Sequence, residues 1–310
     1  MNKLKISFLI PANNEEKVIG NALDNLSKMP YDNLEVLIGL DRCIDNTKYI
    51  VDSYKSKIKS LKSFELESKN GKPQVIDYLM EYVDGDIIII HDADWQFKVT
   101  SKESFLKYLS VFNDYEIGGI AESFPVEYDI KSSKSNFWFR VVSLSHFFWM
   151  KYQKDYLTSF KKGYKTLNDP TMFLTNIFRK SLYQKNYSLA DDFERSKNIM
   201  DQGYSIAIFD DLKMPRFVST YHKINLRDLF KQKRRTSIAR KQLKKIHEID
   251  LPLLKYTFPV LFYMLKESFK ESIFSGIKVG LWILINIIAK LSTIFSSLSS
   301  KKGWNMRASR

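Results

Sequence analysis

The sequence is poor in features that would indicate a secreted, metal-stapled or membrane-spanning protein. Its 310 residues include one cysteine, Cys43, so the chain can form no internal disulfide and has no CxxC metal site. No apolar run reaches the ~20 residues that a spanning helix needs. The N-terminal apolar run, Ile6 to Ile10, is too short for a signal peptide, so we expect the chain on the cytoplasmic side of a membrane.

Acidic residues are also scarce relative to basic ones. The chain has 35 Asp and Glu against 49 Lys and Arg, giving a formal net charge of +14 and a pI of about 9.5. This excess indicates an anionic partner, such as nucleic acid, an anionic membrane surface or a phosphorylated small molecule. The apolar content of 44% is sufficient for a real core and excludes a disordered chain.

The first hundred residues alternate between strand-like and helix-like segments. Strands are predicted at 5–11, 33–41, 63–68 and 85–94, and helices at 14–30, 46–61 and 72–83. This order predicts right-handed crossovers and an α/β fold with a mostly parallel sheet. Polar clusters follow three of these strands, namely "PANNEE" (11–16), "DRCIDNT" (41–47) and "HDADWQ" (91–96). In such sheets the chemistry lies beyond the carboxyl ends of the strands, so we expect a site there.

Later segments are less regular. We expect a helix in the aromatic stretch 135–157, strand structure within 169–180, and a helix that leads into a strand within 189–211. The stretch 225–245 is predicted to form a basic helix.

The four isoleucines at 87–90 end at two carboxylates, Asp92 and Asp94. If the strand continued, both side chains would point to one face and repel each other, so a cation is expected near them. Mg²⁺ or Mn²⁺ would suit, because these ions prefer oxygen ligands and leave positions for a substrate phosphate. The alternative is that the pair simply ends a strand at a solvated loop.

Five stretches in order resemble motifs of the family 2 glycosyltransferases, which have the GT-A fold. They are "PANNEE", "DRCIDNT" with Cys43 where Ser is more usual, "KNGKPQVIDYLMEYVDGDIIIIHDAD", "LADDFE" and "NLRDLFKQKRR", and together they span Lys5 to about Leu243. The resemblance implies transfer of a sugar from a nucleotide-diphosphate donor (a UDP- or GDP-sugar) by a metal-dependent inverting displacement. It also implies a role in glycan biosynthesis.

The resemblance assigns residues to the donor. Lys72 is expected to approach the diphosphate, and Asp92 to contact ribose or the metal. Asp94 is expected to bind the metal, which would be Mn²⁺ or Mg²⁺. "DADWQ" also resembles the DADxQ of polyprenyl-phosphate mannosyl transferases, which makes Gln96 a further metal ligand. The residues expected to line the nucleoside pocket are Pro11, Ala12, Glu15 and Asp41.

The same resemblance makes Asp192 the catalytic base, with Asp191 where many relatives carry Glu. An inverting transfer needs such a base, because the acceptor hydroxyl must lose its proton. The alternative is that the two form an ordinary acidic first turn of a helix. Gln232, Arg234 and Arg235 match the family's QxxR, which meets the diphosphate, although Thr236 replaces its Trp. A solvated basic face is the alternative there.

The tail contains two apolar segments, Tyr256–Leu265 and Val279–Ala289, with lysines at their edges. We expect a catalytic domain at 1–245 and, at 246–310, helices that lie in the interface at the cytoplasmic face of the cell membrane, as in a peripheral or monotopic protein. The alternative is that these helices pack on the core. A lipid-linked acceptor would fit an enzyme of this kind.

Two other classes compete with a glycosyltransferase. A nucleic-acid-binding protein would explain the charge, but no RNA- or DNA-binding motif is present and three strand ends are acidic, so we expect no nucleic acid partner. A nucleotidyltransferase would share the sheet and the acids. It would, however, want a Gly-rich basic loop after the first strand, where "PANNEE" is acidic.

Overall fold

The computed structural model describes residues 4–68, 71–122, 135–161, 163–168, 174–219, 223–248 and 256–294. The chain packs into two compact units. The first unit comprises Met1–Ser123, Ser159–Tyr187 and Asp191–Thr220, and the second unit comprises Phe124–Thr158, Ser188–Ala190 and Tyr221–Arg310. These units are defined by packing, so the functional boundary expected near residue 245 stays a prediction.

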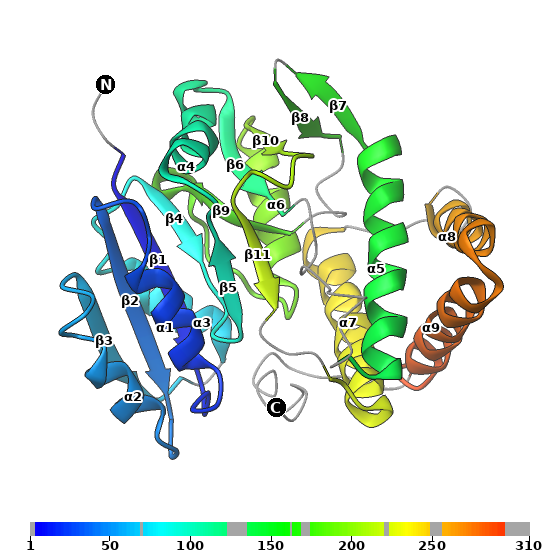
Figure 1. The fold of residues 1–310 in the computed structure, drawn as a ribbon, viewed down its shortest axis with the longest axis horizontal. Coiled ribbons are helices and arrows are strands. Elements are labelled where there is room, and N and C mark those ends of the chain that lie inside the picture. The colour runs from blue at the N-terminus through cyan, green and yellow to red at the C-terminus, as the bar shows by residue number, and fades with distance from the viewer. Residues whose placement is uncertain are drawn as a thin grey trace. The chain divides into compact units, whose positions relative to one another are not determined.

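A 9-stranded sheet runs through the first unit (Figure 1). β1 pairs in parallel with β2 and β4, β2 with β3, and β6 with β10, while β9 runs antiparallel between β4 and β6. The mixed, mostly parallel sheet confirms the predicted α/β class. Its spatial order is β3 (Leu61–Leu66), β2 (Leu34–Asp41), β1 (Ile6–Ala12), β4 (Ile87–Ile90), β9 (Thr175–Arg179), β6 (Ile117–Ala121), β10 (Ser205–Ile208), β8 (Tyr164–Leu167) and β7 (Thr158–Lys161).

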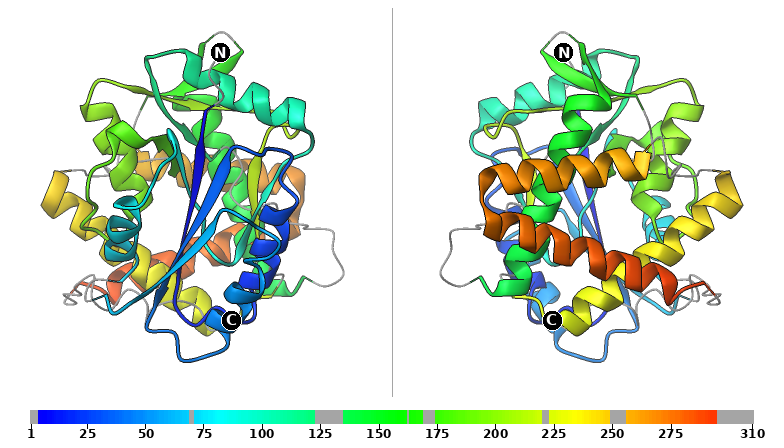
Figure 2. Two further views of the ribbon diagram at one scale, coloured as in Figure 1. Left: turned by 90° about the vertical axis from the view of Figure 1, so that its left-hand side faces the viewer. Right: turned by 90° about the vertical axis from the view of Figure 1, so that its right-hand side faces the viewer.

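Helices cover both faces of the parallel strands. α1 (Ile19–Ser27) and α3 (Lys72–Met80) lie on opposite sides of β1 to β3 in the left view of Figure 2. α1 buries its apolar face, and α3 packs directly on β2, where a Cβ at Gly39 would lie 2.3 Å from Val75. Cover on both faces explains the run of isoleucines in β4, since all four are at most 1% exposed.

The remaining helices of the first unit are α2 (Thr47–Ser53), α4 (Lys102–Leu109) and α6 (Asp191–Asp201). α6 leads into β10 through Gly203, whose φ of +86° suits a residue without a Cβ. α2 is shorter than the predicted 46–61, and the chain from Tyr54 to the start of β3 forms turns instead. The predicted strand, helix and strand segments within 169–211 are confirmed where the structure describes them.

A second, two-stranded antiparallel sheet pairs β5 (Trp95–Lys98) with β11 (Arg216–Ser219). Its aromatic residues pack on the end of the main sheet. Phe97 lies 5.0 Å from Phe217 and 5.9 Å from Phe8 between ring centroids, and His91 lies against Phe8 and Phe217.

The second unit is helical. It contains α5 (Phe137–Tyr156), α7 (Leu226–His247), α8 (Phe258–Glu271) and α9 (Ile273–Leu291). α9 packs against α5, α7 and α8, and the right view of Figure 2 shows α8 and α9 side by side as an antiparallel pair. The predictions of an aromatic helix and a basic helix are therefore confirmed.

The expectation that no tail segment is long enough to span a membrane was wrong for α9. The predicted segment began at Val279, whereas the helix begins at Ile273 because Ser272 caps it, its side chain accepting from the backbone N–H of Ser275. An 18-residue window of the resulting 19-residue helix has a mean hydropathy of 1.6, so the helix meets the length and composition of a spanning helix. Core helices of soluble proteins can meet the same criterion, and a third of this segment is buried.

Candidate active site

The loops after β1 and β2 are joined by hydrogen bonds at the carboxyl edge of the sheet. The Asn13 side chain donates to the carbonyl of Asp41 at 2.6 Å, and the backbone N–H of Glu15 donates to Thr47 Oγ1 at 2.8 Å. Asn14 and Arg42 have left-handed backbone conformations, with φ of 54° and 49°. The "PANNEE" and "DRCIDNT" segments therefore form one structure, as the strand order predicted.

The residues expected in the nucleoside pocket lie in this structure and are buried. Pro11 and Ala12 belong to β1, Glu15 is 5% exposed and Asp41 is fully buried. Both carboxylate oxygens of Asp41 accept from Ser68, from its N–H at 2.7 Å and its hydroxyl at 2.6 Å. Nucleoside binding by the four stays a prediction.

Asp92 and Asp94 lie in a turn and not in the strand. β4 ends at Ile90, and the backbone N–H of Trp95 donates to the carbonyl of Asp92 at 3.1 Å. The argument that the pair shares one strand face was therefore wrong, because the chain turns before β5 begins. Asp94 is almost fully buried, whereas the Asp92 side chain is 24% exposed.

An ammonium group lies beside Asp92 in the structure. Lys72 Nζ lies 2.9 Å from Asp92 Oδ1 and 3.6 Å from Asp191 Oδ2. Lys72 opens α3 after Gly71, whose φ is +72°, so this turn directs the lysine to the carboxyl edge of the sheet. The lysine thus connects the DxD turn to the start of α6.

No group of three or more His, Cys, Asp or Glu side chains with metal-binding geometry occurs among the described residues. A pair of carboxylates still fits Mg²⁺ or Mn²⁺, because these ions use one or two carboxylates and complete their shell with water and substrate phosphates. Asp92 and Asp94 supply such a pair, and the amide of Gln96 follows in β5.

Asp191 and Asp192 open α6 in different electrostatic surroundings. Asp191 Oδ2 lies 3.0 Å from Nη2 of Arg195, one helical turn later. Burial acts to raise the pKa of Asp191, but Lys72 and Arg195 outweigh it and hold the pKa below its usual value. Burial and the neighbouring charge of Asp191 raise the pKa of Asp192 to about 6. One carboxylate is therefore held ionised, and the other is close to the pKa of a general base.

Sequence reasoning missed three residues of this cluster, Glu122, Asn176 and Arg195. Glu122 follows β6, Asn176 lies in β9, and Arg195 is fully buried in α6. Two signals were available in the sequence. Glu122 is an acid at a strand end like Asp41, and Arg195 is four residues after Asp191, the spacing of a helical ion pair.

Gln232, Arg234 and Arg235 lie on α7 in the second unit, and all three are partly exposed. Thr236, which stands where relatives carry Trp, donates its hydroxyl to the carbonyl of Gln232 at 3.1 Å. Their contact with a diphosphate stays a prediction. Between them, Lys233 is buried with its ammonium 4.7 Å from the Trp282 ring centroid.

The chain resembles proteins of known class. The sequence profile "Glycosyl transferase family 2" matches residues 7–184, more than half of the chain. A probable glycosyltransferase, YdaM of Bacillus subtilis (strain 168), is 28% identical over 219 residues, which cover 66% of this chain and 49% of that protein. Beta-monoglucosyldiacylglycerol synthase of Nostoc sp. is 27% identical over 155 residues, 48% of this chain and 32% of that protein. The chain therefore spans about half the length, or less, of these two relatives.

A solved structure shows the same fold. The mannosyltransferase PcManGT from Pyrobaculum calidifontis, in complex with GDP-Man and Mn²⁺, aligns with a TM-score of 0.56 at 15% identity, covering 98% of this chain and 79% of that one. The GT-A fold is thereby confirmed, and the profile match favours the glycosyltransferase interpretation over the nucleotidyltransferase and nucleic-acid-binding alternatives. The chain belongs to glycosyl transferase family 2.

Proposed function

We propose that this protein transfers a sugar from a nucleotide-diphosphate donor to a hydroxyl or phosphate acceptor by an inverting displacement, with Asp192 as the base. The observation that carries the proposal is the contrast at the start of α6. Asp191 is held ionised by Lys72 and Arg195, whereas the pKa of Asp192 is raised to about 6. A base with a pKa just below neutral pH is ionised when needed and still accepts a proton readily.

The proposed roles follow from this arrangement. Asp192 accepts the proton of the attacking hydroxyl, and a positioned base of this kind contributes roughly 10²–10⁴-fold to the rate. Asp191, fixed by two cations, supports the turn that presents Asp192. Lys72 lies between the Asp92 turn and Asp191, within reach of both, and would meet the diphosphate.

The donor would occupy the carboxyl edge of the sheet. Asp94, Asp92 and Gln96 would hold Mn²⁺ or Mg²⁺, which when bound would neutralise charge on the departing diphosphate. The GDP-Man and Mn²⁺ held by the mannosyltransferase of the same fold support this class of donor and metal. The nucleoside would contact Pro11, Ala12, Glu15 and Asp41, and the diphosphate would contact Gln232, Arg234 and Arg235.

A mass-spectrometric screen of UDP- and GDP-sugars tests the proposal. We expect one donor to be hydrolysed slowly without acceptor, only with Mn²⁺ or Mg²⁺ present. Asp192→Asn should still bind this donor and should lose transfer. Normal transfer by Asp192→Asn, or full activity in excess chelator, would contradict the proposed base or the proposed metal respectively.

We further propose that α8 and α9 hold the protein on the cytoplasmic face of a membrane. α9 buries one side on the other helices of the second unit, yet its outer side is also apolar. Residues of this side recur at helical spacing and are about half exposed or more: Phe274 75%, Ile277 49%, Leu284 51%, Ile288 47% and Leu291 59%. On α8, Phe258, Phe262 and Phe269 form a similar stripe.

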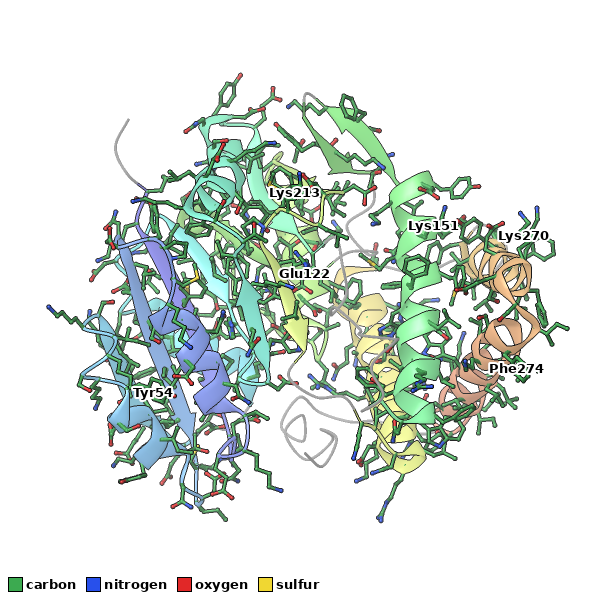
Figure 3. The ribbon with its side chains drawn as sticks, in the orientation of Figure 1. Tyr54, Glu122, Lys151, Lys213, Lys270 and Phe274 are labelled. Carbon is green, nitrogen blue, oxygen red and sulfur yellow. The ribbon has the colours of Figure 1, made fainter. Side chains whose placement is uncertain are left out.

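A helix that is apolar on both sides belongs in a core or against lipid. The outer stripe of α9 is left exposed, and Figure 3 shows Phe274 and Lys270 pointing away from the other helices. Lysines at 266, 270 and 290 would meet anionic headgroups while the phenylalanines enter the interface. The relative named beta-monoglucosyldiacylglycerol synthase supports a lipid-linked acceptor.

Substitution of exposed residues tests this proposal better than deletion of α8 and α9, because the deletion would also uncover the buried sides of α5 and α7. The double variant Phe262→Ser/Phe274→Ser should keep its fold and weaken liposome binding by at least about tenfold, since each buried phenylalanine contributes roughly 1.5–3 kcal/mol. The control is Tyr115→Ser/Phe160→Ser, which alters two aromatic residues of the first unit that are 80% exposed. Equal binding of both variants and wild type to anionic liposomes would contradict membrane association through this surface.

A further inference from the structure

Glu122 is a buried carboxyl group to which the proposed mechanism gives no role. It follows β6 and is 8% exposed (Figure 3). Its Oε1 accepts a hydrogen bond from Nδ2 of Asn176 at 2.6 Å, and its Oε2 is buried without a hydrogen-bond partner in the described parts of the chain. Burying a carboxyl oxygen without a hydrogen-bond partner costs free energy.

A chain of hydrogen bonds connects Glu122 to the acidic pair of α6. The Asn176 amide has two ends, and its donor end faces Glu122. Its acceptor end, Oδ1, therefore accepts a hydrogen bond from Nη1 of Arg195 at 2.9 Å. The same nitrogen also donates to the carbonyl of Thr175 at 2.8 Å, and Nη2 lies 3.0 Å from Asp191 Oδ2. Without an acceptor at position 122, no other hydrogen bond among the described residues fixes the amide orientation that Arg195 requires.

We infer that Glu122 is a positioning residue that, through Asn176, fixes Arg195 on Asp191 and so sets the ionisation of the Asp191–Asp192 pair. The inference rests on the proposed function, because Asp192 is the base that it tunes. It extends that function to a residue that would contact neither the donor nor the acceptor.

Glu122 serves as an acceptor in its neutral form. Burial, with the charges of Asp192 and Asp92, raises its pKa to about 8, while Asn176 and Lys72 oppose the rise. Tyr108 of α4 also faces it, and burial and the Glu122 charge raise the pKa of that phenol as well. A neutral acid accepts through its carbonyl oxygen, and a glutamine amide can do the same.

The test compares Glu122→Gln with Glu122→Leu in the full chain. The Gln variant keeps an acceptor for Asn176, so its kcat and pH profile should stay within about threefold of wild type. The Leu variant has no acceptor, so Arg195 should loosen. Its kcat should fall about 10–100-fold with a smaller change in donor KM, since small misplacements at a site have effects of this size.

The pH profile separates positioning from general damage. The ionisable groups that act on Asp192 include Asp191, Lys72 and Arg195, of which Arg195 lowers its pKa, and Glu122 also lies close enough for the Asp192 charge to raise the Glu122 pKa. In Glu122→Leu, where Arg195 is loosened, the acid limb of the pH profile, which is the range where kcat falls as the pH drops, should therefore move above pH 6. The matched control is Glu35→Leu. Glu35 is a buried acid near the start of β2, away from the carboxyl edge of the sheet, and it accepts hydrogen bonds from the Ser7 hydroxyl and the Asp84 N–H. This control should lower stability and leave the acid limb in place.

Two outcomes would overturn the inference: an unchanged acid limb in folded Glu122→Leu, or a Gln variant as impaired as the Leu variant. If the Leu variant does not fold, Glu122→Asp, whose carboxylate is one methylene short of Asn176, carries the same expectation in milder form. Carbon-13 NMR titration of the aspartate carboxyls reads the shift without turnover. Full activity of Asp192→Asn would sink the proposed function, while the NMR shift would still decide on Glu122.

Discussion

His91 offers a sharp test of how this site is built. The residue precedes the DxD turn and is fully buried, between Phe8 at 6.2 Å and Phe217 at 5.6 Å from ring centroid to ring centroid. Neither ring nitrogen has a hydrogen-bond partner in the portion of the chain that the structure covers. Burial lowers its pKa from 6.5 to about 4, against a smaller opposing effect of the Asp92 charge.

The lowered pKa makes folding depend on pH. Between about pH 6.5 and pH 4 the unfolded chain binds a proton at His91 that the folded chain does not, so stability falls as the pH falls through this range. With these two pKa values the loss is roughly 1 kcal/mol at pH 5.5, roughly 2–3 kcal/mol at pH 4.5, and close to zero at pH 7.5. His91→Phe removes the titrating group and should remove this loss.

The assay is urea unfolding of wild type and His91→Phe from about pH 7.5 to pH 4.5, read by circular dichroism. The stability difference between the two proteins should grow by roughly 2–3 kcal/mol toward the acid end. Packing changes caused by the larger ring are the same at every pH and cancel from this growth. Phe97→Leu, in the same aromatic cluster, should differ from wild type by an amount independent of pH. A flat difference for His91→Phe would show that His91 protonates freely in the folded state.

Three further predictions follow from charged groups. Asp94→Asn should fold normally. In the presence of the donor, Mn²⁺ should raise the melting temperature of the wild type but not that of this variant, which thermal melts with and without Mn²⁺ would detect. Because Asp192 must be ionised to accept a proton, kcat/KM should fall as the pH drops through about 6, and a pH–rate profile without such a limb would argue against it as base. Burial lowers the pKa of Lys233 to about 7, so Lys233→Met should raise the free energy of unfolding by about 1–4 kcal/mol at pH 6 and by less at pH 9, measured by urea unfolding.

The parallel core of the fold could be predicted because local pattern and tertiary role agree there. β2 was expected at 33–41 and spans Leu34–Asp41, since its residues are apolar and buried on both faces. The prediction extended α2 too far, because lysines alternate with Ser56, Ile58 and Ser60 after Tyr54 and no apolar residues recur there at helical spacing. The turn at Asp92 was missed because four isoleucines predict a strand without showing where it ends.

The sequence predicted the acidic residues at the strand ends of the candidate site. It did not predict which residues would contact them. Asp92 and Asp191 are almost a hundred residues apart, and only the folded sheet reveals that Lys72 reaches both. The connection of Glu122 to Arg195 likewise runs through Asn176 of β9, a strand inserted antiparallel between β4 and β6. Such nonlocal insertions have no signature in a single sequence.

The proposed division of roles between Asp191 and Asp192 agrees with helical geometry. Residues four apart lie on the same side of a helix, so "DDFERS" aligns Asp191 with Arg195 and Asp192 with Ser196. Arg195 gives Asp191 a positive partner at 3.0 Å, whereas Ser196 Oγ lies within hydrogen-bond distance of Thr175 Oγ1, at 2.7 Å, and of the backbone carbonyl of Asp192, at 3.1 Å. Asp192 is therefore more exposed than Asp191 and does not share its ion pair with Arg195. A shift of one residue along the helix thus gives Asp191 an ion pair that Asp192 lacks, which agrees with the proposed role of Asp192 as the proton acceptor.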